Sequence, residues 1–236
     1  MQWSQQLFNY CERALDSSFW AEPFNAASNA AFILAAGTAA ITARKQSRPM
    51  AIEWMLITLV ALIGVGSFLF HTLATRWAAV ADAAPIGIFM VVYIIFAMRR
   101  FLTAPWVIVF AGVALFLFSF RAMSAATCDM SWMPITAGAG RACLNGSLAY
   151  GPALVAITVL STAIMIIRHP ATKWIAAATA ALAVSLVFRA IDFEVCSATE
   201  IFGHPRGTHP LWHLTNAFVL YFLLRAAILP PKATQT

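Results

Sequence analysis

Seven stretches of apolar residues, each close to the length that crosses a lipid bilayer, constrain this chain more than any other feature. A crossing helix needs about 20 mostly apolar residues. Charged or proline-containing segments separate the stretches, most clearly at residues 44–49 and 168–170. The stretches are residues 25–43, 50–71, 78–98, 104–123, 147–167, 172–191 and 208–229.

Composition supports the same class of protein. Of the 236 residues, 61% are hydrophobic and 10% are charged, whereas soluble domains carry roughly a quarter charged residues. A disordered chain would need the opposite balance. Lipid-facing backbone must satisfy its own hydrogen bonds, and the alternation typical of a barrel strand is absent. We therefore predict an all-α membrane protein, a bundle of seven transmembrane helices.

Basic residues predict the orientation of this bundle. If the N-terminus is outside, nine of the 15 Lys and Arg residues lie on the inner side and six on the outer side, which is the expected direction of the bias. Seven of the nine acids then lie outside. We expect an outer N-terminal segment (residues 1–24), a transmembrane domain (residues 25–229) and a cytoplasmic tail (residues 230–236).

All four cysteines fall in segments placed outside, where an oxidising compartment would preserve disulfides. Four cysteines allow three pairings. Cys128 with Cys143 would close one loop, and Cys11 with Cys196 would tie the N-terminal segment to the loop before the last span. Free thiols or a metal site are the alternatives.

Several polar residues lie inside the predicted spans, where ionisable groups are costly and usually functional. Ser67 and His71 are four residues apart near the end of the second span, and His209 and His213 have the same spacing at the start of the last. Each pair shares one helix face. Asp82 lies near the start of the third span. The predicted topology puts all five at one depth, near the outer membrane boundary.

Three histidines at one depth suggest zinc, because a catalytic zinc site has three protein ligands and one open position. His71, His209 and His213 are the candidate ligands, Asp82 is the available general base, and Ser67 is a candidate oxyanion donor. The structural alternatives are interfacial histidines, Asp82 as a helix cap and Ser67 as a small packing residue.

Three acids precede the first span, namely Glu12, Asp16 and Glu22. Carboxylate oxygens suit Ca²⁺, so this segment is a candidate calcium site. A solvated acidic segment is the simpler interpretation of the same spacing.

Taken together, these motifs resemble the alkaline ceramidase family, part of a superfamily of seven-helix proteins that includes the adiponectin-receptor group. The first motif resembles the family pattern W-C-E followed by A-E-x-x-N-T-x-S-N. The resemblance covers nearly the whole chain. The matching segments are Cys11-Glu12 with residues 21–29, residues 66–71 with Asp82, and Asp192 with Cys196 and residues 209–213.

The resemblance implies an integral-membrane, zinc-dependent amidohydrolase that cleaves ceramide to a sphingoid base and a fatty acid. By matching positions, His71, His209 and His213 would bind zinc, Asp82 would act as the base and Ser67 would stabilise the oxyanion. Cys11 and Cys196 resemble the disulfide pair of the family.

The family also has a calcium site near its N-terminus, and this chain matches it in part. Glu12 and Glu22 match two of the family's acids, whereas Asn9 and Ala14 stand where the family has Asp and Asn. Asp16 is the candidate replacement ligand.

The sequence thus predicts a zinc hydrolase whose substrate, ceramide or a related N-acyl lipid, arrives laterally from the bilayer and reacts near the outer (periplasmic, extracellular or luminal) face. No nucleic-acid partner is expected. A lipid-binding, receptor-like protein with a structural zinc is the alternative, although the short inner loops offer little surface to a signalling partner. A transporter would need polar groups through the inner half, where Glu53 is the only acid.

Overall fold

The computed structural model describes residues 2–46, 50–126, 143–201 and 203–229. These residues form α-helices and two short 3-10 helices, and the only β pairing among them is two isolated bridges. The elements are α1 (Pro23–Ser28), α2 (Ala30–Arg44), α3 (Ala51–Leu73), α4 (Arg76–Arg100), α5 (Trp106–Ser124), η1 (Cys143–Tyr150), α6 (Gly151–Ile166), α7 (Thr172–Ala190), η2 (Ser197–Thr199) and α8 (His209–Ala227).

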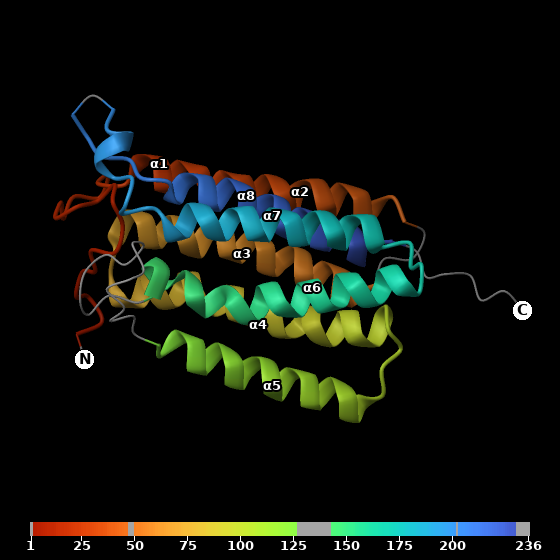
Figure 1. The fold of residues 1–236 in the computed structure, drawn as a ribbon. Helices are drawn as coiled ribbons and strands as arrows, with labels where there is room; N and C mark the ends of the chain where they lie inside the picture. The colour runs from red at the N-terminus through yellow and green to blue at the C-terminus, as the bar shows by residue number, and fades with distance from the viewer. Residues whose placement is uncertain (1, 47–49, 127–142, 202, 230–236) are drawn as a thin grey trace, which may run out of the picture.

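The long helices run alternately up and down one bundle, with the N-terminal segment and the end of α8 at opposite ends (Figure 1). Helices α1 and α2 continue one another, because Asn29 between them keeps helical dihedral angles (φ −66°, ψ −18°). Buried Ala, Leu, Ile and Phe side chains fill the core of the bundle. The beginning and the end of the helical chain lie next to each other. Helices α1 and α2 both pack against α8, which also packs against α7.

Each predicted apolar stretch corresponds to a helix or to consecutive helices of the structure. Among the described residues, six helical segments are long and apolar enough to cross a membrane. Helix α8 is not one of them, since His209, His213 and Asn216 make its first half polar. Its span therefore stays a prediction, as does the orientation of the bundle.

Asp82 does not cap a helix, contrary to one alternative that the sequence left open. Helix α4 begins at Arg76, six residues earlier, and Thr75 is its N-cap, accepting from the Ala78 N–H at 3.4 Å. The helix then continues through Pro85, as membrane helices often do. Asp82 thus lies inside the bundle, on the helix that packs against the one carrying Ser67.

A close approach of α3 and α4 creates this arrangement. A Cβ atom at Gly66 would overlap the carbonyl oxygen of Ala81, so only glycine lets the two backbones meet there. Small residues at such crossings are usual in membranes. The approach puts Ser67 and Asp82, the next residue on each helix, side by side.

The N-terminal segment lies across the turn between α3 and α4. The Leu7 N–H donates to the Ala74 carbonyl at 2.7 Å, and the Arg76 N–H donates to the Gln5 carbonyl at 3.0 Å. Ala74 ends α3 in a left-handed conformation (φ 49°). The segment expected to lie outside the membrane therefore covers one end of the bundle.

We predict that Gly66→Ala destabilises the protein by about 1–3 kcal/mol, because the added methyl group must separate α3 from α4. Gly37→Ala is the matched control, since a Cβ atom there meets no atom within 4 Å. Melting temperatures in detergent should fall for the first variant only. Equal melting temperatures would mean that the contact at Ala81 relaxes without cost.

Candidate metal centre

Three buried histidines form the centre of the polar end of the bundle. His71 comes from the last turn of α3, and His209 and His213 come from the first two turns of α8. One ring nitrogen from each lies within 4.8 Å of the others. In the part of the chain that the structure describes, no other group of three His, Cys, Asp or Glu side chains is close enough to hold a metal ion.

The hydrogen bonds of these rings fit a metal ion. His71 Nδ1 lies 2.5 Å from Glu22 Oε2, and His213 Nδ1 lies 2.7 Å from Ser28 Oγ. His71 Nε2 and His209 Nδ1 are buried without any hydrogen-bond partner, which is rare in native proteins. Metal-bound histidines typically use one nitrogen for the metal and the other for a carboxylate or hydroxyl partner. A metal among the three rings would satisfy the free nitrogens.

Ser67 and Asp82 face the same small cavity as His209 and His213. Its volume is about 30 Å³, room for about one water molecule. The Ser67 hydroxyl interacts with the Asp82 carboxylate, whose Oδ1 atom is buried without a partner. The cavity thus brings a carboxylate with free acceptor capacity beside the histidines.

A large apolar groove adjoins this cavity. Its volume is about 810 Å³, and its walls come mainly from α4, α5 and α6. The two spaces share Ile63, Ile86, Tyr150 and Asn216 as lining residues. An apolar chain in the groove would therefore end at the polar cavity.

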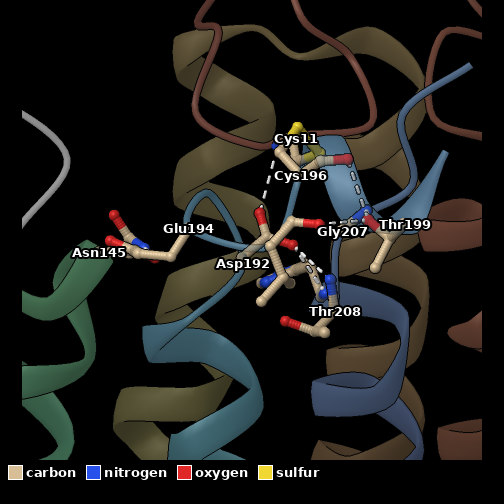
Figure 2. The surroundings of a disulfide bond; sticks show 10 residues. Cys11, Asn145, Asp192, Glu194, Cys196, Thr199, Gly207 and Thr208 are labelled. Carbon is tan, nitrogen blue, oxygen red and sulfur yellow. Dashed lines mark hydrogen bonds between the residues drawn. A yellow bond between two sulfur atoms is a disulfide. The ribbon is translucent and has the colours of Figure 1, made fainter. Parts of the chain in front are cut away.

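The buried Asp192 carboxylate fixes where α8 begins (Figure 2). Its Oδ1 accepts from the backbone N–H groups of Thr208 and His209 at 2.8 and 2.9 Å, and its Oδ2 accepts from Cys11 N–H at 3.1 Å. A carboxylate at a helix N-terminus is stabilised by the helix dipole. Burial raises the pKa of Asp192, and the hydrogen bonds from these three N–H groups lower it and so offset part of the increase.

The disulfide between Cys11 and Cys196 lies directly beside this carboxylate (Figure 2). It joins the N-terminal segment to the loop before α8, residues that are 185 positions apart. Gly207 completes the arrangement: its φ is +66°, and a Cβ atom there would overlap Asp192. The other predicted bridge, Cys128 with Cys143, involves Cys128, which lies outside the described residues.

A buried arginine connects the N-terminal segment to His71. Arg13 Nε lies 2.5 Å from Glu22 Oε1, while the other Glu22 oxygen contacts His71. Arg13 Nη2 donates to the carbonyls of His71 and Thr72 at 2.8 and 3.3 Å. Its Nη1 donates to two carbonyls of its own segment. The guanidinium thus contacts both the backbone of the candidate ligand His71 and the Glu22 carboxylate that orients its ring.

The structure does not support the predicted calcium site, because Glu12, Asp16 and Glu22 have separate partners. Glu12 accepts from the first N–H groups of α1, and burial raises its pKa. Asp16 is exposed, and hydrogen bonds from Ser18 lower its pKa. Burial acts to raise the pKa of Glu22, but His71 and Arg13 outweigh it and hold the pKa below its usual value. The positive charge beside Glu22 is Arg13.

Sequence reasoning missed further residues around the cavity. The Tyr10 ring packs against His209 with ring centroids 3.9 Å apart and an angle of 31° between the planes, and Tyr150 and Asn216 line the cavity wall. Arg189 also lines it, although the sequence argument counted it only as an outer charge. Its position about one helical turn before Asp192, a residue of the family motif, is the sequence feature that could have pointed to a place near the site.

Comparison with known proteins agrees with the motifs. A family model described as Ceramidase matches residues 4–230. The chain belongs to the ceramidase family. No curated protein matches it. The family match confirms the resemblance found in the sequence, and membership of the ceramidase family implies an amidohydrolase that acts on a lipid in a membrane.

We predict that Arg13→Met weakens metal binding about 10- to 100-fold, the usual effect of losing a residue that orients a ligand. Without the guanidinium, the Glu22 carboxylate is buried with one partner fewer, and His71 loses its backbone support. Metal affinity should be measured by chelator competition. Arg206→Met is the matched control, because Arg206 pairs with Glu12 at 3.3 Å, away from the histidines.

A protein that folds but carries too little metal would support this role for Arg13. Arg13→Lys keeps the charge and covers the case in which Arg13→Met does not fold. Unchanged affinity in both folded variants would contradict it.

Proposed function

We propose that this member of the ceramidase family is a zinc-dependent hydrolase that cleaves the amide bond of ceramide or a related N-acyl lipid. The observation that carries the proposal is the cluster of His71, His209 and His213, whose ring nitrogens lie within 4.8 Å of one another, beside the cavity that Asp82 and Ser67 line. Three imidazoles suit zinc and leave an open position. The family match favours this function over the receptor-like alternative.

The residues divide the chemistry among them. His71, His209 and His213 would hold the zinc, which when bound lowers the pKa of a water molecule to about 7 and polarises a carbonyl. Asp82 accepts the proton of the attacking water at its free oxygen and returns it to the leaving nitrogen. Ser67 donates a hydrogen bond to the oxygen on which negative charge develops.

The apolar groove supplies the binding site for the acyl chain. Its walls are built from Ile, Leu, Val, Met and Phe side chains of α4, α5 and α6, which match a hydrocarbon chain and exclude water. Burial of apolar surface would hold the chain while the amide carbonyl reaches the cavity. A lipid could approach this groove laterally from the bilayer.

We also propose that α8 is the seventh span and that residues 1–24 lie on the non-cytoplasmic side. The N-terminal segment and the end of α8 lie at opposite ends of the bundle (Figure 1), which supports an odd number of crossings. The disulfide beside the cavity supports an oxidising compartment on that side. The site would then lie near the outer membrane boundary, with residues 25–229 as the transmembrane domain and residues 230–236 as a cytoplasmic tail.

The first test is metal analysis of the purified protein together with product detection by mass spectrometry on a panel of ceramides and N-acyl lipids. We expect about one zinc ion per chain and release of a fatty acid that stops on chelation and returns with zinc. A folded protein without zinc, or a zinc-loaded protein that cleaves no lipid of the panel, would refute the proposal.

Substitutions should separate metal binding from proton transfer. We expect His213→Ala to lose both zinc and turnover. Asp82→Asn should keep its zinc and lose turnover by about 10²- to 10⁴-fold, the usual contribution of a general base. Zinc content and fatty-acid release are measured on the same preparations, and Gly37→Ala serves as the control that changes neither. An active, zinc-free His213→Ala protein would exclude the mechanism.

A further inference from the structure

One cation in the catalytic cavity has no part in the mechanism above. Arg189 lies in the last turn of α7 and lines the same cavity as Ser67, Asp82 and the two histidines of α8. It is absent from the lining of the apolar groove. Arg189 therefore lies on the side of the cavity where the head group of a bound lipid would be, away from the acyl chain.

No carboxylate of the described residues forms an ion pair with Arg189, although three other close ion pairs are present. Glu194, five residues later, accepts instead from the side-chain amide of Asn145 at 2.9 Å. Asp82 and Asp192 interact with Arg189 electrostatically without forming an ion pair. Both carboxylates have other roles, because the mechanism assigns Asp82 to proton transfer and Asp192 accepts from three backbone N–H groups. The charge of Arg189 is thus left without a carboxylate of its own, although its side chain forms a hydrogen bond with the Tyr10 hydroxyl.

Aromatic rings hold the guanidinium in place instead of an acid. Its central carbon lies 6.0 Å from the ring centre of Tyr10, 5.3 Å from that of Tyr150 and 5.2 Å from that of Trp212. Arg189 Nε is buried and has no hydrogen-bond partner. Aromatic faces position a cation but do not neutralise it, and a buried donor without an acceptor is costly. This donor is therefore available to an anionic oxygen of a ligand.

We propose that Arg189 binds a negatively charged group, a carboxylate or a phosphate, in the head group of the substrate, so that the preferred substrate is an anionic N-acyl lipid and not neutral ceramide. This proposal rests on the hydrolase function. Water would add across the amide, the C–N bond would break, and the products would be a fatty acid and an amine that carries the anionic group.

Matched lipid pairs test the charge preference. N-palmitoylserine and N-palmitoylserinol differ only in a carboxylate against a hydroxymethyl group. N-palmitoyl-O-phosphoethanolamine and N-palmitoylethanolamine differ only in a phosphate. We expect kcat/KM to favour the charged member of at least one pair by about tenfold or more, and the pair that shows it distinguishes carboxylate from phosphate. These assays use the zinc-loaded protein in one neutral detergent.

Arg189→Gln should reduce the charged-to-neutral ratio about 10- to 100-fold, since hydrogen bonds to charged groups are among the stronger ones. Arg189→Lys, which keeps a charge without the planar donors, should give an intermediate ratio. Arg121→Gln is the matched control, because Arg121 is an exposed arginine in the last turn of another helix, α5, and it should keep the wild-type ratio.

A binding measurement keeps this proposal separate from the hydrolase function. The charged lipid should raise the melting temperature of the wild-type protein more than its neutral partner does, and Arg189→Gln should abolish the difference. Equal stabilisation and equal turnover within both pairs, or an unchanged ratio in folded Arg189→Gln, would overturn the role of Arg189. Cleavage of the neutral lipids in that case would leave the hydrolase function intact.

Discussion

The carboxylate of Glu22 is the interaction on which the polar end of this bundle depends. One oxygen faces Arg13 and the other faces His71, and all three side chains are buried. A buried carboxylate is tolerable only when its partners are close and its oxygens are satisfied. The N-terminal segment must therefore lie against the end of α3, and this position also allows Cys11 to reach both Cys196 and Asp192. The start of α8, and with it His209, follows from that contact.

The polar cavity and the apolar groove suit different parts of a lipid substrate. The groove between α4, α5 and α6 is apolar and large, whereas the cavity at the histidines is polar and holds about one water molecule. Electrostatic interactions are stronger where water is scarce. A site built in this way limits the access of bulk water to an amide that reaches the cavity. The aromatic rings of Tyr10, Tyr150 and Trp212 line the cavity.

Hydropathy predicted the helices well, because a backbone in lipid can satisfy its hydrogen bonds only as a helix or a closed barrel. Residues 208–229 were predicted as the seventh span, but α8 is less apolar than the six candidate spans of the described residues, since His209, His213 and Asn216 lower its hydropathy. The residues that identify the site thus weaken the evidence for the span. The shared depth of five polar residues could be predicted from topology alone. The calcium site could not be judged, because no pattern of acids reveals that a buried Arg13 is their neighbour. Arg189 was missed for the opposite reason: its charge was visible, but its direction depends on how α7 packs.

The long separation between the parts of the metal centre has a consequence for biogenesis. His71 comes from the third helix, whereas His209 and His213 come from the last, and the disulfide joins positions 185 residues apart. No fragment released before α8 is made contains a complete metal-binding set. A nascent chain would therefore stay inert in the membrane until its final helix is inserted and packs against the N-terminal segment, so that binding of the proposed metal would mark the completion of assembly.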